Sequence, residues 1–170
     1  MSAPPPEPWL RGPLENTSAF VAPLARSFEQ VREDLAKFTA GLTQEQLWTE
    51  PAPGVGSVGF QLRHIAGSID RLSTYLDGRQ LSEPQWADLR REHDPGATLI
   101  ELLAWIDSAM SQCVTIARQI TDERLPEPRA VGKKALPSTA IGLIVHIAEH
   151  TQRHCGQAIV SAKLVRAKAG

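Results

Sequence analysis

Residues 145–154, VHIAEHTQRH, contain three histidines, each one helical turn after the last: His146, His150 and His154. At about 100° per residue, three residues with this spacing fall within about 80° of one another on a helix. The same face carries apolar side chains, so we expect these imidazoles to point into the protein interior. The stretch therefore predicts a long amphipathic helix with polar chemistry on its inner side.

Three earlier segments also have apolar residues at spacings of three and four, and each predicts a further helix. The connections between them are polar, with one helical turn expected within residues 79–93 and a proline-broken loop over 126–137. No strand pattern of useful length is present. Four amphipathic helices in one small domain bury their stripes against one another most simply as an all-α four-helix bundle. The predicted helices span about residues 20–40, 57–77, 97–117 and 138–166.

The composition is that of one globular domain. The chain has 170 residues, and its 18 Lys+Arg against 19 Asp+Glu argue against a nucleic-acid partner. No apolar run approaches the roughly 18 residues of a membrane span, so we expect no membrane partner. The start lacks the pattern of a secretory signal and the two cysteines suggest no oxidised scaffold, so we expect a cytoplasmic protein.

The N-terminus differs in composition from the rest of the chain. Five of the 13 prolines fall in the first 13 residues. Proline removes backbone donors and favours extended, poorly packed chain. We therefore expect residues 1–15 to form a mobile arm and residues 16–170 to form the bundle domain.

The spacing of the histidines points to a metal ion. Three imidazoles stacked a turn apart on an inner face compete for the same few hydrogen-bond acceptors, and a divalent cation removes that conflict. Neighbouring members lie about 6 Å apart along the helix and can chelate one ion, whereas His146 and His154, about 12 Å apart, are too distant to join it together. A third ligand must come from elsewhere. His64, on the second predicted helix, is a better candidate than His93, which stands in a polar turn.

Six short segments stand out: Leu47-Trp48, the PAPG of residues 51–54, Ser57, Leu62, the HIA of residues 64–66 and the HTQRHCGQ of residues 150–157. Together they resemble one known family, the DinB-like superfamily of bacterial metal-binding helical bundles, over about residues 20–166. The most specific is the last, in which His-x-x-x-His is followed at once by x-Gly-Gln. One departure is Gly56, which stands where many members have tryptophan.

The resemblance implies an up-down-down-up bundle, frequently a homodimer. It also implies one divalent metal, commonly zinc or nickel, bound by His64, His150 and His154. Relatives include thiol-dependent S-transferases and a mycothiol-dependent maleylpyruvate isomerase, which suggests a small-molecule substrate and a low-molecular-weight thiol as a further cofactor.

Three neutral histidine ligands leave an open position on a metal, where water, a thiol or a substrate oxygen can be activated. The leading hypothesis is therefore a metal-dependent enzyme that transfers or hydrolyses a small electrophile, and the competing one is a non-catalytic bundle in which the metal is structural. His146 is open to three roles: a hydrogen-bond partner of a ligand, a substrate contact or a core imidazole. Gln157 either orients a ligand histidine or is a polar residue bonded to the backbone.

Overall fold

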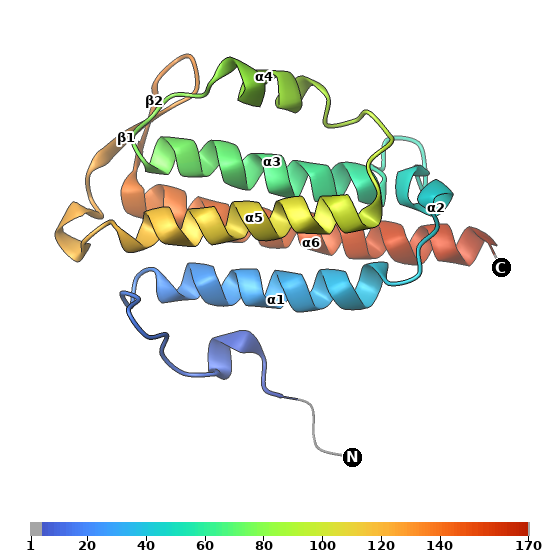
Figure 1. The fold of residues 1–170 in the computed structure, drawn as a ribbon, viewed down its shortest axis with the longest axis horizontal. Helices are drawn as coiled ribbons and strands as arrows, with labels where there is room; N and C mark the ends of the chain where they lie inside the picture. Colours follow the sequence, from blue (N-terminus) through green and yellow to red (C-terminus); the bar gives the residue numbers. More distant parts are fainter. Residues whose placement is uncertain (1–4, 170) are drawn as a thin grey trace.

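Helices form most of the computed structural model, which describes residues 5–169 (Figure 1). Four of the helices are long, and the rest of the described chain forms shorter helices, turns and one hairpin. In chain order the elements are η1 (Pro8–Leu10), α1 (Ala22–Thr39), α2 (Gln44–Trp48), α3 (Val58–Leu76), α4 (Glu83–Arg90), α5 (Leu99–Arg118), η2 (Asp122–Arg124), β1 (Pro128–Val131), β2 (Leu136–Thr139) and α6 (Ala140–Ala169).

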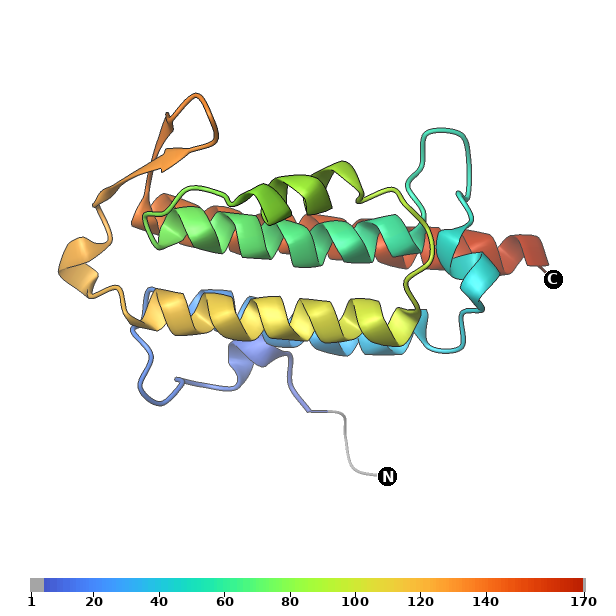
Figure 2. The same cartoon turned by 45° about the horizontal axis from the view of Figure 1, so that its top comes forward.

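The four long helices form a bundle in which α1 and α6 run one way and α3 and α5 run the other way (Figures 1 and 2). α3 packs against both α5 and α6, and α1 packs against α6. Because α3 and α5 are consecutive long helices with the same direction, the chain between them must return along the bundle. α4 lies in this return crossing, over α3 (Figure 2). The arrangement confirms the predicted four-helix bundle and its up-down-down-up order.

The beginnings of the helices are fixed by side-chain caps. Ser57 accepts a hydrogen bond from the backbone N–H of Phe60, so α3 begins where the sequence predicts. α5 begins at Leu99, slightly later than the predicted residue 97, because Thr98 is its N-cap and forms a capping box. In a capping box the N-cap side chain and the third helical residue accept hydrogen bonds from each other's backbone N–H. Within the described residues such boxes form between Thr43 and Gln46, Ser82 and Gln85, and Thr98 and Glu101.

The apolar stripes of the four long helices meet in one core, as the periodicity predicts. Full burial of each large aliphatic or aromatic side chain contributes about 1.5–3 kcal/mol. None of the histidines belongs to this core, so the apolar packing does not depend on them. The largest fully buried side chains of the long helices are Leu24, Phe28, Leu35, Leu62, Ile65, Ile69, Leu76, Leu102, Ile106, Met110 and Ile147.

Two connections differ from the prediction. α4 has eight residues where one helical turn was expected. The expected loop over 126–137 contains a hairpin, in which β1 pairs antiparallel with β2 in the register Pro128↔Thr139. Most of its side chains are exposed or half-buried, so no period-two alternation marks it in the sequence. Arg129 is the exception: it is buried and donates to the backbone oxygen of Leu76, which ties the hairpin to the end of α3.

The predicted mobile arm, residues 1–15, is described from residue 5 onward, and residues 1–4 lie outside the described part. In η1 Pro8 is buried. The Arg11 guanidinium pairs with Glu33 of α1 at 2.6 Å, and Arg26 donates to the backbone oxygen of Gly12. This part of the arm therefore lies against α1, and its mobility in solution stays a prediction.

α5 is long and apolar enough to cross a membrane by length and composition alone, with a mean hydropathy of 1.3. This is weak evidence, because the core helix of a globular bundle passes the same test. Leu102, Ile106 and Met110 of α5 are buried in the core.

Candidate metal centre

Three imidazoles meet between α3 and α6. Nε2 of His64 lies 3.0 Å from Nε2 of His150. The ring of His154 lies 4.2 Å from that of His64 and 4.5 Å from that of His150, between centroids. One ring nitrogen from each histidine lies within 4.8 Å of the other two. The structure thus brings together the three residues that the resemblance implies, and their role as metal ligands stays a prediction.

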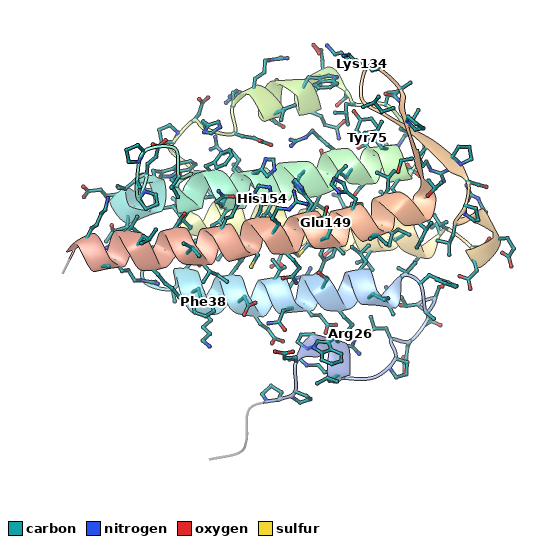
Figure 3. The ribbon with its side chains drawn as sticks, turned by 180° about the vertical axis from the view of Figure 1, so that it is seen from behind. Arg26, Phe38, Tyr75, Lys134, Glu149 and His154 are labelled. Atoms are coloured by element: carbon teal, nitrogen blue, oxygen red, sulfur yellow. The ribbon has the colours of Figure 1, made fainter. Side chains whose placement is uncertain are left out.

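Among the three histidines of α6, His146 is exposed, whereas His150 and His154 are half-buried. Each successive histidine is rotated about 40° further round the helix. His146 therefore lies at the solvent edge, with 46% of its side chain exposed and Nδ1 bonded to Glu149 at 2.7 Å, whereas His154 is half-buried and faces α3 (Figure 3). The expectation that all three imidazoles point into the interior is wrong for His146, and so is its core role. A substrate contact or a bond to a ligand stays a prediction.

A buried carboxylate orients His64. Nδ1 of His64 lies 2.8 Å from one oxygen of Glu92, and Arg71 donates to the other oxygen at 2.7 Å. Burial by itself would raise the pKa of Glu92, but the hydrogen bond from His64 and the charge of Arg71 outweigh it and hold the pKa below its usual value. A carboxylate only accepts hydrogen bonds, so Nδ1 of His64 carries the ring proton and Nε2 presents its lone pair to the cluster.

An amide of α3 orients His154 in the same way. Nδ1 of His154 donates to the side-chain oxygen of Gln61 at 2.7 Å, which leaves Nε2 as the lone pair. The orienting role predicted for Gln157 is therefore wrong. Gln157 is exposed, because it lies on the solvent flank of α6, about 20° from His146 and about 60° from His154. The buried Gln61 takes that place from the facing helix.

The three imidazoles of the cluster are satisfied better by a divalent cation than by hydrogen bonds among themselves. Nε2 of His64 carries no proton. In the absence of a metal, Nε2 of His150 must therefore donate a hydrogen bond to Nε2 of His64. Nδ1 of His150 is then unprotonated. His150 can donate only one proton through Nε2, so it cannot satisfy the lone pairs of both His64 and His154, which are directed at the same cluster. A cation accepts the facing lone pairs directly. Three neutral imidazoles are a donor set for zinc or nickel, so these residues fit such an ion.

Two of the histidines are held neutral by their surroundings. Burial, followed by repulsion from His64, lowers the pKa of His150 from 6.5 to about 4. The same two causes, in the same order, lower the pKa of His154 to about 4. Metal ligation requires the neutral ring, and both residues are already neutral at pH 7.

These pKa values predict that the metal-free protein loses stability as the pH falls from 6.5 towards 4. In this range the unfolded chain takes up protons at His150 and His154 that the folded chain excludes, so acid favours unfolding. Urea unfolding in the presence of a chelator, at pH 7 and pH 4.5, measures the loss. The double variant His150→Gln, His154→Gln should lose clearly less between the two pH values. Equal losses would show that the two rings are not held neutral.

An apolar pocket of about 280 Å³ adjoins the cluster beneath α4. His64, His146 and His150 line one side of it, together with the buried Arg71. The other residues are mostly apolar and come from α3, from α4 and from the segment before α4. They are Ser68, Leu72, Tyr75, Leu81, Trp86 and Leu89.

Sequence reasoning missed Glu92, Arg71 and Gln61. Glu92 stands in a polar connection that has no periodicity, so nothing marks it as buried. Arg71 offered a faint signal, because it lies two turns after His64 on the same face of the predicted helix. His93, predicted to be a surface residue, is exposed and stacks on the ring of Phe60, outside the cluster.

Three solved structures share this fold. A conserved protein of Enterococcus faecalis aligns with a TM-score of 0.71 and 18% identity over 85% of this chain and 95% of its own. YfiT from Bacillus subtilis, described as a probable metal-dependent hydrolase with an unusual four-helix bundle topology, aligns with a TM-score of 0.65 and 19% identity over 93% of both chains. A DinB-like protein from Bacillus cereus aligns with a TM-score of 0.63 and 18% identity over 86% of this chain and 91% of its own.

A search of curated proteins found no significant match. The family model of the DinB superfamily matches residues 27–158. This range contains most of the bundle core and all three clustered histidines, and it confirms the resemblance drawn from the sequence. The chain belongs to the DinB superfamily.

Proposed function

We propose that this protein is a metal-dependent enzyme. His64, His150 and His154 hold one divalent ion, zinc or nickel, and a small electrophilic substrate is hydrolysed or transferred to a small thiol. The observation that carries the proposal is the convergence of His64, His150 and His154 beside an apolar pocket, whose wall includes His64 and His150. From the family resemblance we extend the proposal to a cytoplasmic homodimer.

The geometry favours a catalytic site over a structural one. A structural zinc site is closed by four protein ligands, whereas a catalytic site keeps a position open. Within residues 5–169 no fourth histidine, cysteine or carboxylate joins the cluster of His64, His150 and His154. The apolar core is also complete without these side chains. YfiT, described as a probable metal-dependent hydrolase, shares the fold and supports the hydrolytic form of the proposal.

The residues of the chain divide the work at the site. When bound, the ion supplies a Lewis acid that polarises a substrate oxygen or lowers the pKa of water or a thiol. Glu92 and Gln61 keep the lone pairs of His64 and His154 directed at one point. The apolar wall that includes Trp86 keeps bulk water from the reacting groups.

His146 is our candidate for proton transfer. It lines the pocket, its ring centroid lies 5.3 Å from that of His150, and Nδ1 is bonded to Glu149. When Nδ1 donates to this carboxylate, Nε2 is free to take a proton from the attacking water or thiol. This assigns the substrate-contact role that the sequence left open.

The open position can be tested without knowing the substrate. Cobalt-substituted protein should change its visible spectrum when azide is added, because azide occupies the vacant side of the ion. Chelation should remove the spectrum and lower the melting temperature by only a few degrees. A spectrum that azide leaves unchanged, or a domain that unfolds on chelation, would support the structural hypothesis instead.

A further inference from the structure

A second cavity, of about 480 Å³, lies between α3, α4 and α5. It contains none of the histidines. The Arg71–Glu92 pair separates it from the histidine pocket, because Arg71 lines both cavities and Glu92 lines only this one. Its volume is within the range of small-molecule sites, about 300–1,000 Å³. The cavity therefore has room for a ligand of its own.

The wall of this cavity contains an arginine without an anion. The Arg63 guanidinium carbon lies 5.1 Å from the ring centroid of Trp48 and 5.9 Å from that of Trp105. Its one hydrogen bond within residues 5–169 runs to the backbone oxygen of Arg91, and its Nε is buried without a partner. Among the described ion pairs none includes Arg63. A partly desolvated guanidinium is stabilised by a carboxylate, which it can bind through two nitrogens.

The other charged groups of the cavity leave this need unmet. Arg71 is already paired with Glu92. Asp70 accepts a hydrogen bond from the side-chain amide of Gln85 at 2.7 Å, and Asp88 is exposed on α4. Asp70 and Asp88 keep their negative charges, but among the described contacts neither of them pairs with Arg63, which therefore remains a cation without a carboxylate partner.

An aromatic surface adjoins this charge. Trp105 lines the cavity and remains 47% exposed, although it is one of the largest apolar side chains. Its ring lies beside the Arg63 guanidinium. Indole rings stack on planar ligands, so the cavity combines an anion anchor with a stacking surface.

We propose that this cavity is a second ligand site, which binds a small planar carboxylate with its carboxylate on Arg63 and its flat face against Trp105. The site is separate from the metal centre and goes beyond the proposed enzymatic function. Because its wall contains no histidine of the metal cluster, the ligand binds in the absence of metal.

Benzoate is the probe for the test, with NMR of ¹⁵N-labelled protein kept metal-free by a chelator. The indole N–H signal of Trp105, assigned with the Trp105→Phe variant, should shift saturably on titration. Benzamide has the same ring without the charge and should bind at least tenfold more weakly. Arg63→Gln should weaken benzoate binding at least tenfold. Arg90→Gln, which removes the same charge from α4 outside the cavity, should bind as the wild type does.

The proposal fails if benzoate gives no saturable shift, if benzamide or benzylammonium binds as tightly as benzoate, or if Arg63→Gln binds as the wild type does. Should Arg63→Gln not fold, Ser108→Trp fills the cavity from an exposed position of α5 and should also weaken binding at least tenfold. Unchanged binding to that variant overturns the proposal. Metal-free conditions keep this outcome independent of the proposed function.

Discussion

Replacing His150 with glutamine is expected to abolish tight metal binding, whereas His146→Gln should leave metal binding unchanged. The two residues are one turn apart on α6, but the ring of His150 lies in the cluster and that of His146 lies at its solvent edge. Removing an outer hydrogen-bond partner of a metal ligand costs about 10–100-fold in affinity. Loss of one of three ligands should cost more than this.

Metal content per chain after purification without an affinity tag measures the effect, followed by competition titration with a chromogenic chelator. Circular dichroism should confirm that both variants are folded. His146→Gln is expected to keep its metal and to lose catalytic rate by about 10²–10⁴-fold, as befits a proton-transfer group. Equal metal content in wild type and His150→Gln would contradict the assignment of the site.

Glu92→Gln is expected to weaken metal binding by about 10–100-fold and to lower the free energy of unfolding. The carboxylate is 5% exposed and Arg71 is 9% exposed, so the substitution leaves a positive charge buried without its partner. Breaking a buried pair in this way costs about 3–5 kcal/mol. The loss should fall near 3 kcal/mol, because the amide oxygen still accepts one hydrogen bond.

The double variant Arg71→Met, Glu92→Gln separates the two effects. Removing both charges should recover part of the lost stability, because no buried charge is left unpaired. Metal affinity should not recover, because His64 still lacks the carboxylate that fixes its lone pair. Urea unfolding of the metal-free proteins and metal competition titrations provide the two readouts. A double variant that binds metal like the wild type would show that Glu92 does not orient His64.

The long helices could be predicted from the sequence because each buries one continuous stripe. In α3, for example, Leu62, Ile65 and Ile69 are all fully buried. The hairpin and α4 could not be predicted in the same way. α4 has no buried residue and the strands are largely exposed, so neither element leaves a hydrophobic period in the sequence.

The candidate metal centre was predictable only in part. Spacing on a single helix relates His150 to His154, because both lie within one turn. No local pattern relates either residue to His64, which was chosen from the two remaining histidines by its place on a predicted helix and by the family resemblance. Glu92 lies 28 residues after His64 in an irregular connection, and only the fold brings their side chains together. Hydrophobic periodicity describes a single segment, so it cannot predict contacts between side chains of different segments.

The segment that returns over α3 and contains α4 can change the shape of the two cavities without changing the packing of the four long helices. α4 contributes walls to both cavities while burying no residue of its own in the core. Substitutions in α4 can therefore change which ligands fit each cavity, while the core packing of the four long helices stays the same. Glu92 is the exception. It lies in the same connection, and its carboxylate must keep its position beside Nδ1 of His64.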